Sequence, residues 1–188
     1  MNSENKIPHI LFLSNLIESK GVFVLLDALK TLKNKGYSFI CDFVGGETAE
    51  IDSERFSKEI KRRGLDSNCV YHGRKVGDEK EHYWGNTDII VHPTYEDCFP
   101  LVILEAMSYG VPVISTNEGA IKDIIDDGET GLIAEKRNSA DLADKIAILL
   151  DDSDLRQRIG EAGNKKFKRQ FTIEAFEQRL CEILKKLT

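Results

Sequence analysis

The chain has 188 residues, of which 41% are hydrophobic and 31% charged, a composition that predicts one globular domain with a real core and excludes a disordered tail. Its net charge of −6 argues against a basic surface for nucleic acid. The start from Met1 to Pro8 is not typical of a signal peptide, and no apolar run approaches the roughly 20 residues of a membrane span. The four cysteines fit neither a zinc site nor a CxxC motif. We expect all four, Cys41, Cys69, Cys98 and Cys181, to be reduced in a cytoplasmic protein.

Short β-like runs alternate with longer helical patterns along the chain. The expected strands are residues 9–14, 39–44, 69–72, 89–92, 113–115 and 131–134. The expected helices are residues 23–35, 53–63, 78–85, 100–109, 121–126, 139–150, 154–169 and 172–187. Strands separated by single helices predict βαβ units. We therefore predict an α/β fold, a doubly wound parallel sheet (Rossmann-like) with a helical C-terminal tail. Such sheets bind ligands beyond the carboxyl ends of their strands.

Two loops that follow predicted strands carry residues suited to a ligand. Lys20 lies just before a helix start and could pair with a phosphate as a point charge, although a solvated surface lysine is the simpler interpretation. Gly45 and Gly46 end the second strand, where glycine permits close approach of backbone or ligand. A tight strand-to-helix turn explains these glycines equally well.

The most informative stretch runs from Tyr95 to Gly110. Pro100 suits the first turn of a helix, and the residues after it are apolar on nearly every side, which predicts a buried helix. Glu105 is the exception, and a buried carboxylate needs a partner. It could reach a ligand near the helix N-terminus, which attracts phosphate, and Asp97 could approach from the preceding loop. The alternative is that Glu105 lies on a solvated stripe and Asp97 caps the helix.

Other catalytic patterns are missing from the sequence. It contains no GxxxxGK[ST] loop, no GxGxxG after the first strand and no GxSxG elbow. The histidines show no metal-binding spacing. His92 precedes Pro93 at a strand end and could line the cleft, but we interpret it as structural. We expect neither a metal nor another cofactor.

The run from Asp97 to Met107, followed by Gly110-Val111-Pro112-Val113-Ile114, resembles the signature of the family 4 retaining glycosyltransferases with the GT-B fold. Lys20-Gly21 is similar to that family's first loop, but Asn15 stands where the family has arginine. The first acid is Asp97 where glutamate is usual, and Cys98 stands where glycine is common. Residues 118–125 and 128–133 resemble a helix start and a Gly-x-x-Gly turn of the family, the first with Ala120 and Asp123 as departures.

This resemblance implies a role for each matching residue. Glu105 would bind the ribose hydroxyls of the donor nucleotide, Asp97 would face the donor sugar, and Lys20 would hold the diphosphate and stabilise the leaving group. Asp97 and Lys20 are thus the candidate catalytic residues. The candidate donor-binding residues are Glu105, Asn15 and Gly45, with Arg74 and Lys75 near the base and the segment Phe99, Pro100, Leu101 and Val102 at the sugar and phosphate.

The resemblance also implies what the whole protein does. Residues 1–188 would be a single nucleotide-sugar-binding domain, the C-terminal half of a GT-B enzyme without its acceptor domain. The reaction would move a hexosyl unit from a UDP-, GDP- or ADP-sugar to an acceptor hydroxyl with retention. The expected partners are that sugar nucleotide and an N-terminal acceptor-binding domain, with no nucleic acid. Peripheral contact with the inner membrane face would come through the full-length enzyme. A nucleotide-sugar 2-epimerase domain and a non-catalytic binding or scaffold domain are the alternatives.

Overall fold

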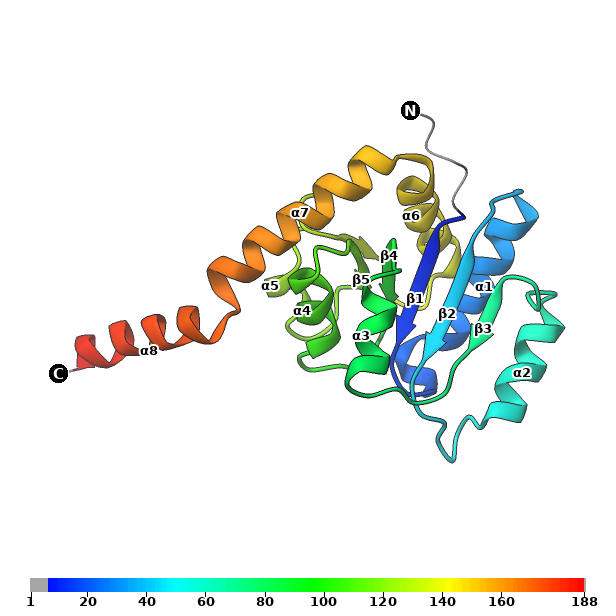
Figure 1. Ribbon diagram of the computed structural model, residues 1–188, viewed down its shortest axis with the longest axis horizontal. Coiled ribbons are helices and arrows are strands. Elements are labelled where there is room, and N and C mark those ends of the chain that lie inside the picture. The colour runs from blue at the N-terminus through cyan, green and yellow to red at the C-terminus, as the bar shows by residue number, and fades with distance from the viewer. Residues whose placement is uncertain (1–6, 188) are drawn as a thin grey trace.

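Six parallel strands form one sheet in the computed structural model, which describes residues 7–187 (Figure 1). The strands are β1 (His9–Leu13), β2 (Ile40–Val44), β3 (Cys69–Tyr71), β4 (Ile89–His92), β5 (Val113–Thr116) and β6 (Leu132–Ala134). They lie in the order β3-β2-β1-β4-β5-β6, and every neighbouring pair is parallel. The strand order reverses between β1 and β4, which is the place where doubly wound sheets bind their ligands.

Helices follow the strands as the sequence predicts. They are α1 (Val22–Asn34), α2 (Ser53–Arg62), α3 (Asp78–Trp84), α4 (Leu101–Ser108), α5 (Ile121–Ile124), α6 (Ser139–Asp151), α7 (Ser153–Gln170) and α8 (Ile173–Leu187), with a 3-10 turn η1 (Glu18–Lys20) before α1. Four begin with a side-chain cap, in which Asp52, Asn138, Asp152 or Thr172 accepts a hydrogen bond from a backbone N–H of the first turn. The predicted α/β fold with a helical C-terminal end is therefore confirmed.

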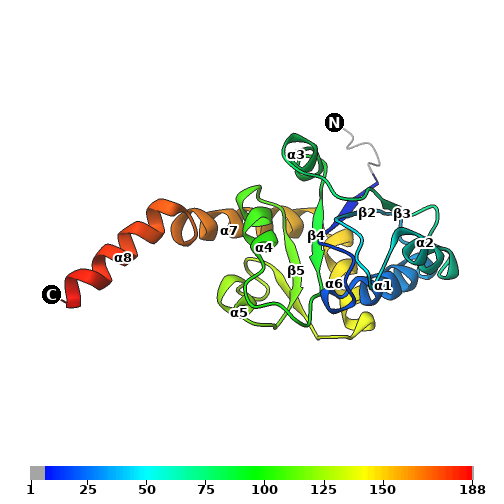
Figure 2. The same ribbon diagram turned by 90° about the horizontal axis from the view of Figure 1, so that it is seen from below.

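Both faces of the sheet are buried, which explains its nearly continuous apolar strands. Ile10 and Phe12 of β1 point into a core shared with α1 and α6. Leu11 and its neighbour Ile90 point into a second core with α3 and α4. Figure 2 shows α4 and α6 on opposite sides of β4 and β5. Strand residues thus alternate between two helical layers, and the strand ends are left free to build a site.

Two details of the predicted helices are wrong. The helix α4 is buried on one face only, because Leu101 is 64% exposed and lies opposite the face that packs on the sheet and α7. The helix α5 ends at Ile124 rather than at residue 126. Ile125 is extended, and the backbone N–H of Asp126 donates to the hydroxyl of Thr130, so the chain turns there instead of continuing the helix.

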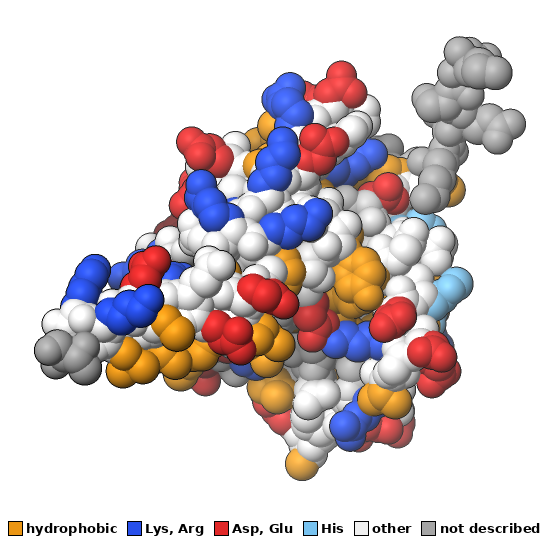
Figure 3. Space-filling view, turned by 60° about the vertical axis from the view of Figure 1, so that its left-hand side comes forward, with side chains coloured by type: hydrophobic (Ala, Val, Ile, Leu, Met, Phe, Trp, Pro, Cys, Tyr) orange, Lys and Arg blue, Asp and Glu red, His pale blue; other side chains and the backbone are white. Residues whose placement is uncertain are grey.

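The helix α8 extends away from the body of the domain (Figure 1). Its apolar side chains are exposed and form a row along it (Figure 3); they are Ile173, Phe176, Leu180, Ile183 and Leu184. Of the two outcomes considered for this helix, packing on the body or exposing a patch, the structure shows the exposed patch. None of the described helices is long and apolar enough to cross a membrane.

The cysteines are all free, as predicted. Cys41 and Cys69 are buried and lie opposite each other in the register of β2 and β3. Burial raises the pKa of the Cys41 thiol, so that it behaves as a small hydrophobic residue. Cys98 and Cys181 are exposed.

Candidate functional site

The loops that leave β1, β2 and β3 are tied together at the carboxyl edge of the sheet. Ser14 N donates to Val44 O at 3.0 Å, and Gly45 N donates to Gly73 O at 3.0 Å. A Cβ atom at Gly45 would lie 1.8 Å from the carbonyl oxygen of Ser14. Any side chain there would force the two loops apart, so the close approach of backbone alone accounts for this glycine.

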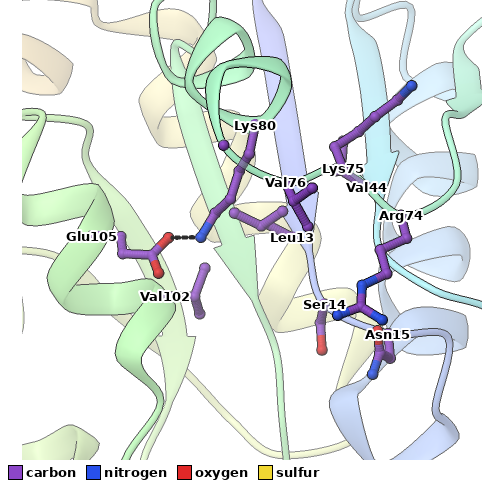
Figure 4. A pocket seen from close by; sticks show the side chains of 12 residues that line it. Leu13, Ser14, Asn15, Val44, Arg74, Lys75, Val76, Lys80, Val102 and Glu105 are labelled. Atoms are coloured by element: carbon purple, nitrogen blue, oxygen red, sulfur yellow. Dashed lines mark ion pairs between the residues drawn. The ribbon is translucent and has the colours of Figure 1, made fainter.

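A cavity of about 410 Å³ opens beyond these loops (Figure 4). Its lining comes from the ends of β1 and β2, the loop after β3, the helix α3 and the helix α4. Three basic residues and one acidic residue line it, namely Arg74, Lys75, Lys80 and Glu105. The net charge of the chain is −6, so this is a locally cationic cavity in an acidic protein. Such a cavity favours an anionic ligand.

Glu105 has a partner in this cavity that the sequence did not reveal. Its Oε2 atom lies 2.5 Å from Nζ of Lys80 on α3, and the two side chains are 37% and 31% exposed. The same Oε2 atom makes no hydrogen bond of good geometry to any described residue. That oxygen is itself buried, whereas no described residue forms a hydrogen bond or ion pair with the other oxygen, Oε1, which can accept from hydroxyl groups of a ligand. Glu105 lies on the wall of the cavity, where its side chain is partly exposed.

The other predicted residues of this cavity differ in orientation. In Figure 4 the side chain of Arg74 points toward Ser14 and Asn15, whereas Lys75 points away from them. Lys75 forms an ion pair with Glu79 at 3.1 Å. Oδ1 of Asn15 accepts a hydrogen bond from Gly46 N at 2.9 Å. The amide of Asn15 is thereby fixed on the wall of the cavity without bringing a charge to it.

A second group of residues surrounds Asp97. Nζ of Lys20 lies 2.7 Å from Oδ2 of Asp97 and also donates to the carbonyl of Glu96 at 3.0 Å. Nε2 of His92 lies 3.4 Å from the same Oδ2. The hydrogen bond from His92 and the charge of Lys20 lower the pKa of the Asp97 carboxyl to about 2. Asp97 is therefore ionised at neutral pH and does not cap α4, which has no side-chain cap.

The loop that carries Asp97 rests on a glycine turn. Ala120 N donates to Cys98 O at 3.0 Å. A Cβ atom at Gly119 would lie 2.2 Å from the carbonyl oxygen of Asp97, and its φ of +50° belongs to the left-handed region. The turn thus fixes Asp97 beside a cavity of about 640 Å³, which Lys20, Asp97 and Glu118 help to line.

The segment before and within the first turn of α4 is partly exposed. Phe99 is 45% exposed and Leu101 is 64% exposed, while Pro100 is buried. Val102 lines the same cavity as Glu105. Phe99, Pro100 and Leu101 line neither of the two cavities, whereas every other predicted site residue lines one of them. The contacts of all these residues with a donor stay predictions.

One residue of the site, Lys80, was missed from the sequence, and a structural role was preferred for another, His92. Lys80 is one charged residue in a polar helix, and only the position of α3 opposite α4 makes it the partner of Glu105. His92 was interpreted as structural, yet it is 2% exposed, contacts Asp97, and its Nδ1 atom has no hydrogen-bond partner among residues 7–187. Its place at the end of β4 was the available signal. Within the same range no group of three or more His, Cys, Asp or Glu side chains could hold a metal ion.

Residues 2–166 match the family model for glycosyl transferases group 1. The chain belongs to this family. The glycosyltransferase MJ1178 of Methanocaldococcus jannaschii is 33% identical over 164 residues, which make up 87% of this chain and 44% of MJ1178. The chain therefore spans less than half the length of that relative.

Two solved structures resemble this chain. The C-terminal domain of the group 1 glycosyl transferase LpcC from Francisella tularensis is 28% identical, with a TM-score of 0.79 and 90% of each chain covered. The structure of Anabaena HepE in complex with UDP and glucose shares the fold, with a TM-score of 0.83, 21% identity, and coverage of 95% of this chain and 48% of HepE. The resemblance to a C-terminal GT-B domain is thus confirmed.

Proposed function

We propose that this chain binds a nucleoside-diphosphate sugar and forms the donor-binding half of an enzyme that transfers a hexosyl unit to an acceptor hydroxyl with retention. The observation that carries the proposal is the cationic cavity at the carboxyl edge of the sheet, with one carboxylate on its wall, in a member of the group 1 family. A sugar nucleotide has both matching parts, because its diphosphate is anionic and its ribose offers two hydroxyls.

The two cavities would bind different parts of the donor. Glu105 accepts hydrogen bonds from the ribose, since a carboxylate only accepts and can serve two hydroxyls at once. Lys80 neutralises Glu105 and holds it in place. Lys20 and Asp97 lie at the second cavity, where the donor sugar and its bond to the diphosphate would be. Cationic groups fixed there stabilise the charge that develops when the bond to the sugar breaks.

Asp97 is unsuited to act as a general acid in this scheme. With a pKa of about 2 it carries no proton at neutral pH, where an effective general acid needs a pKa near the working pH. Its role is to accept hydrogen bonds from the sugar and to orient Lys20. We infer that transfer also needs groups from an acceptor-binding domain, so that the isolated chain binds the donor and turns over little or none of it.

The test measures thermal unfolding with UDP, GDP, ADP and their common sugar conjugates. A ligand at about a hundred times its dissociation constant adds roughly 2.7 kcal/mol, which corresponds to a rise of about 5–10 °C for a domain of this size. One nucleotide class should give this rise, and Glu105→Ala should abolish it. Glu54→Ala serves as control, because Glu54 is exposed on α2 and pairs with Lys58 away from the cavity.

Three results would contradict the proposal. If none of the nucleotides raises the unfolding temperature, the chain has no donor site. Full transfer by the isolated chain would refute the need for a second domain. A 2-epimer of the donor sugar in the reaction mixture would replace transfer with epimerisation. Where transfer is reconstituted with the acceptor domain, the anomeric configuration of the product, measured by NMR, decides whether it proceeds with retention.

A further inference from the structure

The cations around the two cavities differ in whether they are already neutralised. Lys20 is paired with Asp97 at 2.7 Å, Lys80 with Glu105 at 2.5 Å and Lys75 with Glu79 at 3.1 Å. Arg74 has neither an ion pair nor a side-chain hydrogen bond to any residue in the described part of the chain. Its guanidinium is therefore the cationic group of the cavity whose charge is available to a ligand.

The direction of Arg74 places this charge over the β1 end of the cavity. Figure 4 shows its side chain extending from the loop after β3 toward Ser14 and Asn15, away from the Lys80–Glu105 pair. The wall it faces offers hydroxyl and amide groups but no charge, and the amide oxygen of Asn15 is already used by Gly46 N. Nothing on this wall neutralises the guanidinium before a ligand enters.

The chemistry of a guanidinium decides which part of a sugar nucleotide it contacts. Its planar array of N–H donors matches two oxygens of a phosphate at once. The base of a nucleotide is uncharged and offers a guanidinium no ion pair. The ribose carries hydroxyl groups, from which the carboxylate of Glu105 can accept hydrogen bonds. The diphosphate carries the negative charge of the donor, and both lysines of this cavity are already paired with carboxylates.

From this arrangement we infer that Arg74 is the diphosphate-binding residue of the cavity and selects nucleoside diphosphates over nucleosides. The inference rests on the proposed function, and it moves Arg74 from the base, where the sequence resemblance put it, to the phosphates. Arg74 is exposed in the absence of ligand. Water therefore solvates its charge, and an unpaired guanidinium there destabilises the folded chain little. A ligand gains the interaction without first breaking an existing ion pair.

The experiment compares the affinities of a nucleoside diphosphate and of its nucleoside. The wild-type chain is titrated with UDP, GDP and ADP by calorimetry, and the tightest of the three is then compared with the matching nucleoside, followed by NMR where binding is weak. Arg74→Ala should weaken diphosphate binding about tenfold to a hundredfold, as expected for hydrogen bonds to a charged group. Nucleoside binding should change by less than about twofold, because the lost contact is to phosphate.

Two further variants sharpen the result. Arg74→Lys keeps the charge but loses the planar fork, so it should restore part of the diphosphate affinity. Arg158→Ala is the matched control, because Arg158 is an exposed arginine on α7, a helix whose first turns lie near the starts of β4 and β5 at the opposite edge of the sheet. Both affinities should stay at the wild-type level in that control.

The outcomes separate this inference from the proposed function. Equal weakening of nucleoside and diphosphate binding by Arg74→Ala would place Arg74 at the base and overturn the inference. Undiminished diphosphate binding would overturn it as well, while leaving the donor site intact. If the wild-type chain binds none of the three diphosphates, the proposed function fails and the inference fails with it.

Discussion

Removing the charge of Asp97 should destabilise the domain in a way that depends on pH. The perturbation is Asp97→Asn, which keeps the shape of the side chain and leaves Lys20 and His92 without their carboxylate. In the folded chain the pKa of Asp97 falls from 3.8 to about 2. At 1.36 kcal/mol per pKa unit, this shift corresponds to about 2 kcal/mol of stability. The side chain is 16% exposed, so solvent screens this interaction less than it screens a surface ion pair.

The sign of the pH dependence follows from the lowered pKa. The stabilisation is fully present above the unfolded value near 3.8 and is lost as the pH falls through the folded value of about 2. The variant should therefore unfold about 2 kcal/mol more easily than the wild type at pH 7. At pH 3, midway between the two values, the difference should shrink to about 1 kcal/mol.

Urea denaturation of both chains at pH 7 and pH 3 measures these differences. Asp66→Asn provides the control, because Asp66 is an exposed carboxylate in the loop before β3, and its effect should stay within about 0.5 kcal/mol at both pH values. The reasoning would be refuted if Asp97→Asn cost nothing at pH 7. It would equally be refuted if the cost were the same at pH 7 and pH 3, because the effect would then come from packing rather than from charge.

Three further variants test the turn, the core and the cavity. Gly119→Ala should cost about 1–3 kcal/mol in urea, since its Cβ would collide with the carbonyl of Asp97 at 2.2 Å; an unchanged unfolding curve would show that the loop gives way freely. Phe56→Ala should cost about 3–5 kcal/mol because Phe56 is fully buried, whereas Phe176→Ser on the exposed face of α8 should cost less than about 0.5 kcal/mol. A large loss in Phe176→Ser would mean that α8 packs against the body. Asn15→Arg should raise the affinity for a nucleoside diphosphate about tenfold by adding a second free cation, and calorimetry would contradict this if the affinity stayed the same or fell.

The order of the elements could be read from the sequence because each depends on a local pattern. The strand from Ile89 to His92 is a continuous apolar run, and its predicted limits agree with those of β4. Pro100 marked the start of α4, since proline is tolerated where no intrahelical N–H bond is needed. The burial of α4 was judged wrongly because composition alone does not show which face meets the sheet, and Leu101 is exposed.

Some residues of the candidate site could be predicted from the sequence, whereas their partners could not. Glu105, Asp97 and Lys20 were identifiable because their spacing and surroundings form a recognisable pattern along the chain. Their partners were not, because contacts such as Lys80 with Glu105 and His92 with Asp97 depend on where α3, β4 and α4 lie in space. The sequence by itself determined the parallel α/β fold and the residues at the strand ends, since hydrophobic periodicity and turn residues act over short distances. Only the tertiary structure decided which cations are neutralised and that Arg74 is left free among the described residues, because ion pairs form between helices and loops that are distant in sequence.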